Sequence, residues 1–326
     1  MTTPTETACE LPIIDVSVLS TGGDAVEAVA AEILEATRRS GFFYVRNHGI
    51  DQQLIDAAVS ASAGFFARAL DDKRDVSVNQ RNRGFMEIGE CRLGEARHHC
   101  MKEVFFFGPE HGAQTGDDLP LMGDNQWPVF MPGLREAVWP YYRAVMSCGG
   151  RLLSAVAVAL GLKKDFFRGY YRQSLGRAQL LHYPPLPADA FEDQFSAAPH
   201  TDFGCITLLW QDNNGGLEVR LPDDRWIAAP PVPGTLVINV GDLLARWSND
   251  RMRSTLHRVR NLAGRRRYSM AVFFDPDSDA LIDPRDMGVS GHEALYPAVT
   301  AGEYIMSKNR GTFGHYQRAA GAGAGA

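Results

Sequence analysis

The stretch Pro199-His-Thr-Asp-Phe-Gly-Cys-Ile-Thr-Leu-Leu-Trp210 joins a short polar motif to a strand-like apolar run. Alternate residues of an extended chain project from the same face, so His200 and Asp202 are expected to point into one space. An imidazole and a carboxylate are both metal ligands. Because His-x-Asp occurs by chance in many chains, the motif alone favours an ordinary structural role over a metal site.

Short apolar runs that alternate with turn residues surround this stretch and fill the second half of the chain. Six of them are interpreted as strands, at 178–182, 205–210, 217–220, 226–228, 236–240 and 268–274. Pro222-Asp-Asp224 separates two of these runs and indicates a tight hairpin. Such a series predicts a β-sandwich or barrel.

The first half of the chain has a mainly helical pattern. Strands are expected at 11–15, 42–45 and 102–107, and helices at about 24–40, 51–69 and 134–160. Pro140 is expected to bend the last helix or to mark a second start, because proline cannot donate the helical hydrogen bond. The long helix leads into the β region without a Pro/Ser/Gly linker, which favours one unit with a helical amino-terminal half.

Composition limits the partners of this protein. The chain has 326 residues, 45% of them apolar and 22% charged, and a formal net charge of −6. This mild acidity gives no long-range attraction to phosphate backbones or anionic lipid, so we expect a small-molecule partner and neither nucleic acid nor membrane. The amino terminus lacks the pattern of a signal peptide and the five cysteines have no paired spacing. We therefore expect a cytoplasmic protein that is a monomer or a weak homo-oligomer.

A third candidate metal ligand, His257, lies 57 residues after His200 in Ser254-Thr-Leu-His-Arg258. Two histidines and one carboxylate form the facial triad of non-haem Fe(II) oxygenases, which leaves coordination positions open. The separation excludes one local helix that presents all three ligands, so different strands have to converge. The remaining histidines considered show no matching carboxylate spacing and are interpreted as loop or core residues: His98, His99, His111 and His182.

Ten residues after His257, Arg267-Tyr-Ser269 places an arginine and a serine on one face of a strand. A guanidinium captures a carboxylate with two parallel hydrogen bonds, and a serine hydroxyl adds another. The pair is therefore a candidate receptor for a dicarboxylate. The alternative is that Arg265-Arg-Arg267 forms a solvated basic turn or a phosphate patch, which the apolar strand that follows makes the weaker interpretation.

The order and spacing of these motifs resemble those of the iron- and 2-oxoglutarate-dependent oxygenases of the isopenicillin N synthase-like family. The resemblance extends from about Leu11 to Phe274 and includes Leu11-Pro-Ile-Ile-Asp15, Gly41-Phe-Phe-Tyr-Val-Arg-Asn-His-Gly-Ile50, His182-Tyr-Pro-Pro185, His200-Thr-Asp202, Gly241-Asp-Leu-Leu-Ala-Arg-Trp-Ser-Asn249, Ser254-Thr-Leu-His-Arg-Val259 and Arg267-Tyr-Ser269. It implies an α+β fold, in which a helical amino-terminal portion and a long central helix pack on a double-stranded β-helix, or jelly roll. It divides the chain into an amino-terminal cap region (11–118), a jelly-roll domain (176–278) and a disordered tail (319–326).

The resemblance also implies a reaction and the residues that serve it. The Fe(II) ligands would be His200, Asp202 and His257. The contacts to the 2-oxoglutarate cosubstrate would be Arg267, Ser269 and Tyr183. The implied enzyme is a dioxygenase that uses O2 to oxidise, most often to hydroxylate, a C–H bond of a small organic molecule while 2-oxoglutarate becomes succinate and CO2. The expected setting is specialised metabolism such as antibiotic biosynthesis.

Substrate contacts are expected from the amino-terminal half. Arg83 and Lys102-Glu103 are candidates for a polar or carboxylated substrate, and Phe105 and Phe107 for a lining that excludes water. Two alternatives remain open. Isopenicillin N synthase and aminocyclopropane-carboxylate oxidase share the triad and the Arg-x-Ser motif but perform oxidase or cyclase chemistry without 2-oxoglutarate. The other alternative is a non-catalytic metal-binding sensor on the same scaffold.

Overall fold

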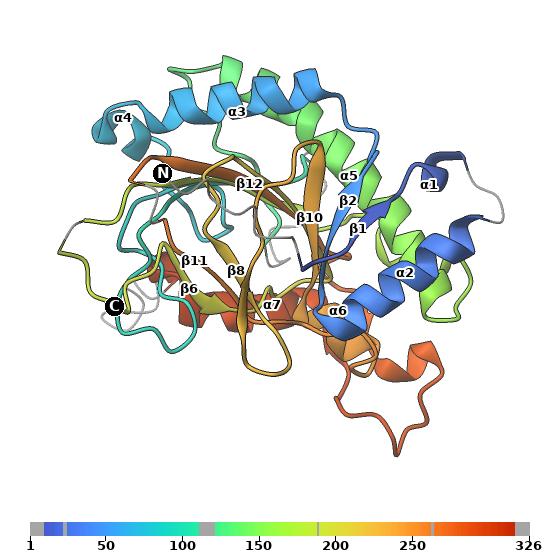
Figure 1. Cartoon of the computed structure of the whole chain (residues 1–326). Helices are drawn as coiled ribbons and strands as arrows, with labels where there is room; N and C mark the ends of the chain where they lie inside the picture. Colours follow the sequence, from blue (N-terminus) through green and yellow to red (C-terminus); the bar gives the residue numbers. More distant parts are fainter. Residues whose placement is uncertain (1–9, 22–24, 111–120, 188, 262–263, 317–326) are drawn as a thin grey trace, which may run out of the picture.

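Strands from both halves of the chain meet in one large sheet (Figure 1). The structure, a computed structural model, describes residues 10–21, 25–110, 121–187, 189–261 and 264–316. The expected tail at 319–326 and His111 lie outside these residues.

The large sheet has eight strands in the order β1-β2-β10-β7-β12-β5-β4-β3. β1 pairs with β2 in parallel, and the remaining pairs of this sheet are antiparallel. In that order the strands cover Ile13–Asp15, Phe42–Arg46, Thr235–Val240, Ile206–Gln211, Arg267–Phe274, Arg177–Tyr183, Glu103–Phe107 and Gly84–Met86. β1 to β4 belong to the amino-terminal half, so the two halves of the chain share one sheet.

A second sheet of four antiparallel strands, in the order β6-β11-β8-β9, faces the inner side of the large sheet. These strands cover Ala197–His200, His257–Val259, Leu217–Arg220 and Trp226–Ala228. Leu181 and Ala271 from the large sheet share a buried apolar cluster with Val219 and Val259 from the small one. Two facing antiparallel sheets around one core form the expected jelly roll.

The six strands expected in the second half are present, with ends shifted by at most one residue. The hairpin between β8 and β9 is also confirmed. Asp224 adopts a positive φ of 66°, and the Leu221 amide donates to the Arg225 carbonyl at 2.7 Å. The sequence did not indicate β6 and β11, which are only four and three residues long.

Helices cover the outer face of the large sheet (Figure 1). The three main ones are α2 (Ala25–Arg39), α3 (Gln52–Phe66) and α5 (Gly133–Ala159). Their apolar stripes form one buried cluster with the outward side chains of the sheet. α5 continues through Pro140, so this proline does not mark a second start. Buried Val138 and Tyr141 on either side of it pack against the core and offset the lost hydrogen bond.

Shorter elements complete the fold. They are α1 (Val18–Thr21), α4 (Leu70–Arg74), α6 (Asp242–Trp247), α7 (Ala301–Thr312), the 3-10 helices Phe166–Tyr170 and Pro284–Met287, and the strand pair β13 (Leu281–Ile282) and β14 (Val299–Thr300). α7 leads to Phe313, which forms a β-bridge with Cys91 and packs edge-on against Phe106. Within the described ranges no helix is both long and apolar enough to cross a membrane.

Candidate metal centre and its cavity

Backbone pairing between β6 and β11 brings the three candidate metal ligands together. His257 lies directly opposite His200 in this pair, and Asp202 follows two residues after β6 ends. The two imidazole rings are 4.3 Å apart between centroids. Oδ1 of Asp202 lies 3.7 Å from Nε2 of His257 and 4.0 Å from Nε2 of His200. The three ligand atoms lie within 4.8 Å of one another, as one shared ion requires.

Hydrogen bonds outside the triad orient each ligand. Nδ1 of His200 lies 2.7 Å from the Ala198 carbonyl, and Nδ1 of His257 lies 3.1 Å from the Thr255 carbonyl. A carbonyl only accepts, so each Nδ1 carries the proton and each Nε2 keeps its lone pair for a metal.

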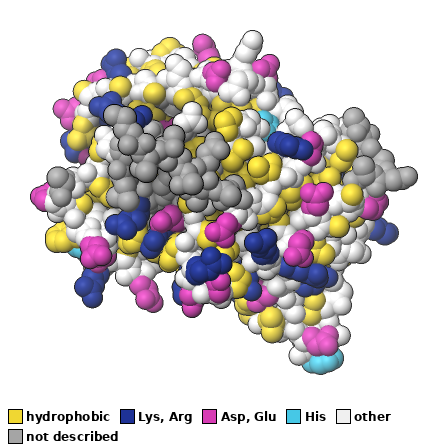
Figure 2. Space-filling view, viewed as in Figure 1, with side chains coloured by type: hydrophobic (Ala, Val, Ile, Leu, Met, Phe, Trp, Pro, Cys, Tyr) yellow, Lys and Arg dark blue, Asp and Glu magenta, His cyan; other side chains and the backbone are white. Residues whose placement is uncertain are grey.

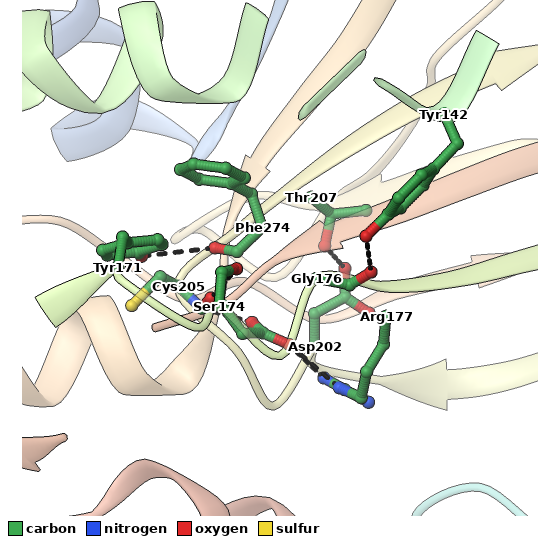
Figure 3. A network of polar contacts seen from close by, with 10 residues as sticks. Tyr142, Tyr171, Ser174, Gly176, Arg177, Asp202, Cys205, Thr207 and Phe274 are labelled. Carbon is green, nitrogen blue, oxygen red and sulfur yellow. Dashed lines mark hydrogen bonds and ion pairs between the residues drawn. The ribbon is translucent and has the colours of Figure 1, made fainter. Parts of the chain in front are cut away.

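The Asp202 carboxylate is held in the same way. Its Oδ2 accepts hydrogen bonds from the Thr207 hydroxyl at 2.5 Å and the Asn239 amide at 2.7 Å, which leaves Oδ1 facing the histidines (Figure 3 draws the Thr207 contact).

Electrostatics give His200 and Asp202 the protonation states that a divalent ion needs. Burial and the neighbouring His257 lower the pKa of His200 to about 3, so its imidazole is neutral at pH 7. Burial raises the pKa of Asp202, but the two histidines, Asn239 and Thr207 outweigh it and keep the net pKa below the ordinary value. Neutral imidazoles and an ionised carboxylate are the donor set that fits Fe(II).

Arg267 and Ser269 point from β12 into the space between the sheets, and both are almost fully buried. The guanidinium lies 4.7 Å over the Tyr183 ring, and it donates to the Gly215 carbonyl at 2.7 Å and to Gln211 Oε1 at 3.2 Å. The Ser269 hydroxyl lies 3.4 Å from both Arg267 Nη1 and the Tyr183 hydroxyl. No described carboxylate lies within 4.0 Å of Arg267. A buried guanidinium without an acidic partner is suited to bind an anion.

One cavity between the sheets connects this receptor to the triad. Its lining includes the triad, Arg267, Ser269 and Tyr183, together with apolar side chains such as Phe42, Leu181, Leu209 and Val259. A second cavity adjoins it on the side of Phe313 and α7, and His200 and Asp202 line both. His200 and Asp202 therefore lie between the two chambers, and His257 lines the first chamber.

Lys102, the residue before β4, lines both chambers and is only 6% exposed. Burial works against its charge, but the negative potential of Cys91, Cys100, Tyr183 and Asp202 holds the pKa of its ammonium group above the ordinary value. Lys102 is therefore a buried cation beside the metal centre.

The structure places the other expected substrate contacts away from both chambers. Phe105 and Phe107 lie on the opposite face of β4, where they pack against Trp127 in the cluster between the sheet and the helices. Residues two apart in a strand share a face, so Lys102 itself lies on the side of Val104 and Phe106, which belong to the inner cluster. Both phenylalanines are therefore core residues, and their expected role as cavity lining is corrected.

Arg83 is also a structural residue. Its side chain is fully buried and donates to the carbonyls of Arg81, Asn82 and Leu121, each at 3.1 Å. Burial lowers its pKa to about 10. These bonds fasten the loop before β3 to the segment at Leu121 and occupy Nη1 and Nη2 of the guanidinium, while its Nε has no hydrogen-bond partner among the described residues.

Thr207 and Asn239 are site residues that the sequence interpretation missed. They lie opposite one another in the pairing of β7 with β10, and both are buried. Each is the one polar residue in the interior of its strand, away from the polar end residues Gln211 and Thr235, and that pattern is the signal that could have identified them. Buried polar side chains need a partner, and here the partner is Asp202.

Comparisons with known proteins agree with this geometry. Residues 175–276 match the 2OG-Fe(II) oxygenase superfamily, and residues 11–129 match the family described as non-haem dioxygenase in morphine synthesis N-terminal. The chain is 33% identical to the 2-oxoglutarate-Fe(II) type oxidoreductase hxnY of Emericella nidulans, over 93% of this chain and 90% of that protein. It is 30% identical to a 1-aminocyclopropane-1-carboxylate oxidase of Dictyostelium discoideum, over 83% of each.

The fold is similar to that of a solved oxygenase. The full-length T7H of Neurospora crassa in complex with alpha-KG superposes with a TM-score of 0.81 at 28% identity, over 93% of this chain and 97% of that one. The matches cover both halves of the chain, and the His-Asp-His cluster lies inside the matched jelly roll. The chain therefore belongs to the 2OG-Fe(II) oxygenase superfamily, which is named for the use of Fe(II) and 2-oxoglutarate.

Proposed function

We propose that this enzyme hydroxylates a C–H bond of a small organic molecule bound beside the His200–Asp202–His257 triad. The observation that carries the proposal is that the triad and the Arg267 guanidinium, which has no acidic partner in the part of the chain described, line one cavity. When bound there, Fe(II) with 2-oxoglutarate and O2 supplies the oxidising chemistry, and 2-oxoglutarate leaves as succinate and CO2.

The residues of this chain have positioning roles in the proposal. His200, Asp202 and His257 would hold the ion, and a set of three protein ligands leaves coordination positions for cosubstrate and oxygen. Arg267 and Ser269 bind the distal carboxylate of 2-oxoglutarate, and the Tyr183 hydroxyl joins them through Ser269. The apolar walls from both sheets limit the entry of water, which strengthens these electrostatic contacts.

The setting is proposed from the relatives and from composition. Related proteins carry names of small organic molecules, such as validamycin A dioxygenase, and T7H was solved with thymine. We infer a role in specialised metabolism, with the cap region at 11–118 and the jelly-roll domain at 176–278 as its working parts. The net charge of −6 and the interspersed acidic and basic side chains in Figure 2 favour a partner other than nucleic acid or membrane. The described cysteines are free and buried, which supports a reducing, cytoplasmic location. We also propose that the protein is a monomer or a weak homo-oligomer, which sedimentation analysis tests.

The experiment is an anaerobic titration of the apo protein with Fe(II) and then 2-oxoglutarate. Bidentate chelation is expected to give a weak visible metal-to-ligand charge-transfer band. In Arg267→Met the affinity for 2-oxoglutarate should fall by about 30-fold or more, because truncating one side of a buried, hydrogen-bonded charge pair costs about 2–5 kcal/mol. Binding of Mn(II) should stay within about twofold. The matched control is Arg266→Met, which removes an exposed arginine one position earlier and should leave both affinities unchanged.

The titration separates the proposal from its alternatives. The 1-aminocyclopropane-1-carboxylate oxidase relative gives chemistry without 2-oxoglutarate a specific basis. If Fe(II) binds but no charge-transfer band forms with 2-oxoglutarate, the enzyme performs oxidase or cyclase chemistry without 2-oxoglutarate. If Arg267→Met and Arg266→Met lose equal affinity, the assignment of Arg267 to the cosubstrate is wrong.

A further inference from the structure

The second chamber has one buried cation, Lys102, that has no carboxylate partner in the described part of the protein. Its lining includes Lys102, Arg177, Asn309 and the aromatic rings of Phe203, Phe273 and Phe313. Asp202 is the one carboxylate among these lining residues, and it faces the metal position.

Arg177 is already neutralised. Its Nε and Nη2 both donate to Oδ2 of Asp275, at 2.9 and 2.7 Å, and this aspartate is fully buried. The Arg177 guanidinium also lies 5.0 Å over the Phe273 ring. Lys102, by contrast, has no carboxylate within 4.0 Å and donates no hydrogen bond among the residues described. Two neighbouring cations in one chamber thus differ in that only Lys102 is available to a ligand.

The charges of the loaded site identify what Lys102 needs. The two positive charges of Fe(II) and the one of Arg267 balance the carboxylate of Asp202 and a dianionic cosubstrate. Lys102 then remains without a carboxylate partner at a position that is 6% exposed. The neighbouring Cys100 thiol, whose pKa is lowered to about 6 by its hydrogen bond to Cys91 and by Lys102, offsets part of the Lys102 charge. A buried charge without a partner is costly, and one further negative charge in the chamber removes that cost.

From the position of Lys102 beside the metal centre we propose that the second chamber binds a substrate with one carboxylate, and that Lys102 pairs with this group. This proposal rests on the function proposed above. The body of the substrate packs between Phe273 and Phe313, next to the metal position at His200. The reacting C–H bond therefore belongs to a compact carboxylic acid.

A second polar group fits the same chamber. Asn309 of α7 is fully buried, and its amide interacts with the Tyr316 hydroxyl but makes no hydrogen bond of normal geometry with the described residues. An amide both donates and accepts, so it suits a hydroxyl, a carbonyl or a ring nitrogen of the substrate. Lys102 and Asn309 reach the chamber from different parts of the fold, so they hold a bound acid at two points.

The test uses matched acids and amides as probes. The Mn(II)-loaded protein, saturated with 2-oxoglutarate, is titrated by calorimetry with benzoate, furan-2-carboxylate and cyclohexanecarboxylate, each beside its uncharged amide. At least one acid should bind tenfold or more tightly than its amide. Lys102→Met and Lys102→Gln should remove this preference and leave 2-oxoglutarate affinity unchanged, whereas the exposed-lysine control Lys163→Met should keep it.

Each other outcome overturns the inference. If no acid of the panel binds better than its amide, the chamber does not select a carboxylate. If the preference survives in both Lys102 variants, another group provides it, and if these variants lose affinity for 2-oxoglutarate, Lys102 serves the cosubstrate instead. Failure of the proposed function is distinguished by the wild-type protein itself, which would then form no complex with 2-oxoglutarate before any probe is added.

Discussion

Replacing Thr207 by valine tests whether the support of Asp202 matters for metal binding. The two side chains have nearly the same shape, so Thr207→Val removes the hydroxyl and preserves the packing of β7. The carboxylate of Asp202 is 8% exposed and accepts two hydrogen bonds on Oδ2, from Thr207 and from Asn239. The variant therefore removes half of this support and leaves the Asn239 contact in place.

The expected loss follows from these contacts. A hydrogen bond to a buried charged group contributes about 1.5–3 kcal/mol, and loss of such a partner of a metal ligand weakens metal affinity by about 10- to 100-fold. The Thr207 hydrogen bond also helps to lower the pKa of Asp202. Without it this pKa rises, protons compete with the ion at higher pH, and the pH midpoint of metal binding should move upward.

Calorimetric titration with Mn(II) between pH 4 and 8 measures both effects, and circular dichroism checks at each pH that the variant is folded. Thr207→Ser is the matched control, because it keeps the hydroxyl and loses only a methyl group. We expect the serine variant to bind like the wild type and the valine variant to bind at least tenfold more weakly. Equal affinities for the two variants would refute the argument that this hydroxyl prepares Asp202 for the ion.

Two further predictions concern stability. Glu103→Gln should destabilise the fold by about 3 kcal/mol, measured by urea unfolding at pH 7, because Glu103 bridges Lys73 at 2.5 Å and His182 at 2.7 Å in a buried network. Burial raises the pKa of Glu103, but its hydrogen bonds to these partners lower the pKa on balance. The stabilisation is therefore present above the ordinary pKa near 4.5 and is lost as pH falls below it. The stability difference between variant and wild type should shrink at pH 4, and a constant difference would contradict this. Phe105→Ala should lower the free energy of unfolding by about 3–5 kcal/mol in the same assay, while the affinities of the folded protein for Mn(II) and 2-oxoglutarate stay unchanged. A selective loss of either affinity would show that Phe105 belongs to the binding site.

The strands that the sequence predicted and those that it missed differ in one physical respect. Runs such as Leu236-Val-Ile-Asn-Val240 are apolar because both faces of the strand are buried, by the helices on one side and by the small sheet on the other. β6 and β11 are short and carry the polar ligands themselves, so no apolar run identifies them. The ligands could be recognised from their residue types and spacing, whereas the strands that carry them could not.

The substrate-side residues show a different limit. Arg83, Phe105 and Phe107 were expected near the substrate because of where they occur in the chain. Which face of β4 points inward depends on its pairing with β5, where Phe105 lies opposite Leu180, and that long-range pairing cannot be read from a local pattern. Lys102 was among the candidates by residue type, but only the folded chain reveals that it is buried and lacks an acidic partner.

The position of α7 has a consequence for engineering this enzyme. Asn309 and Phe313 reach the second chamber from the end of the described chain, and Leu93 and Lys102 reach it from the amino-terminal half. None of these four belongs to the strands that carry the triad. Under the proposed substrate assignment, a mutagenesis library at Leu93, Asn309 and Phe313 would vary which substrate the enzyme accepts and would leave the cavity that holds the triad and Arg267 unchanged. Natural divergence would have the same freedom to change the substrate without changing the metal ligands.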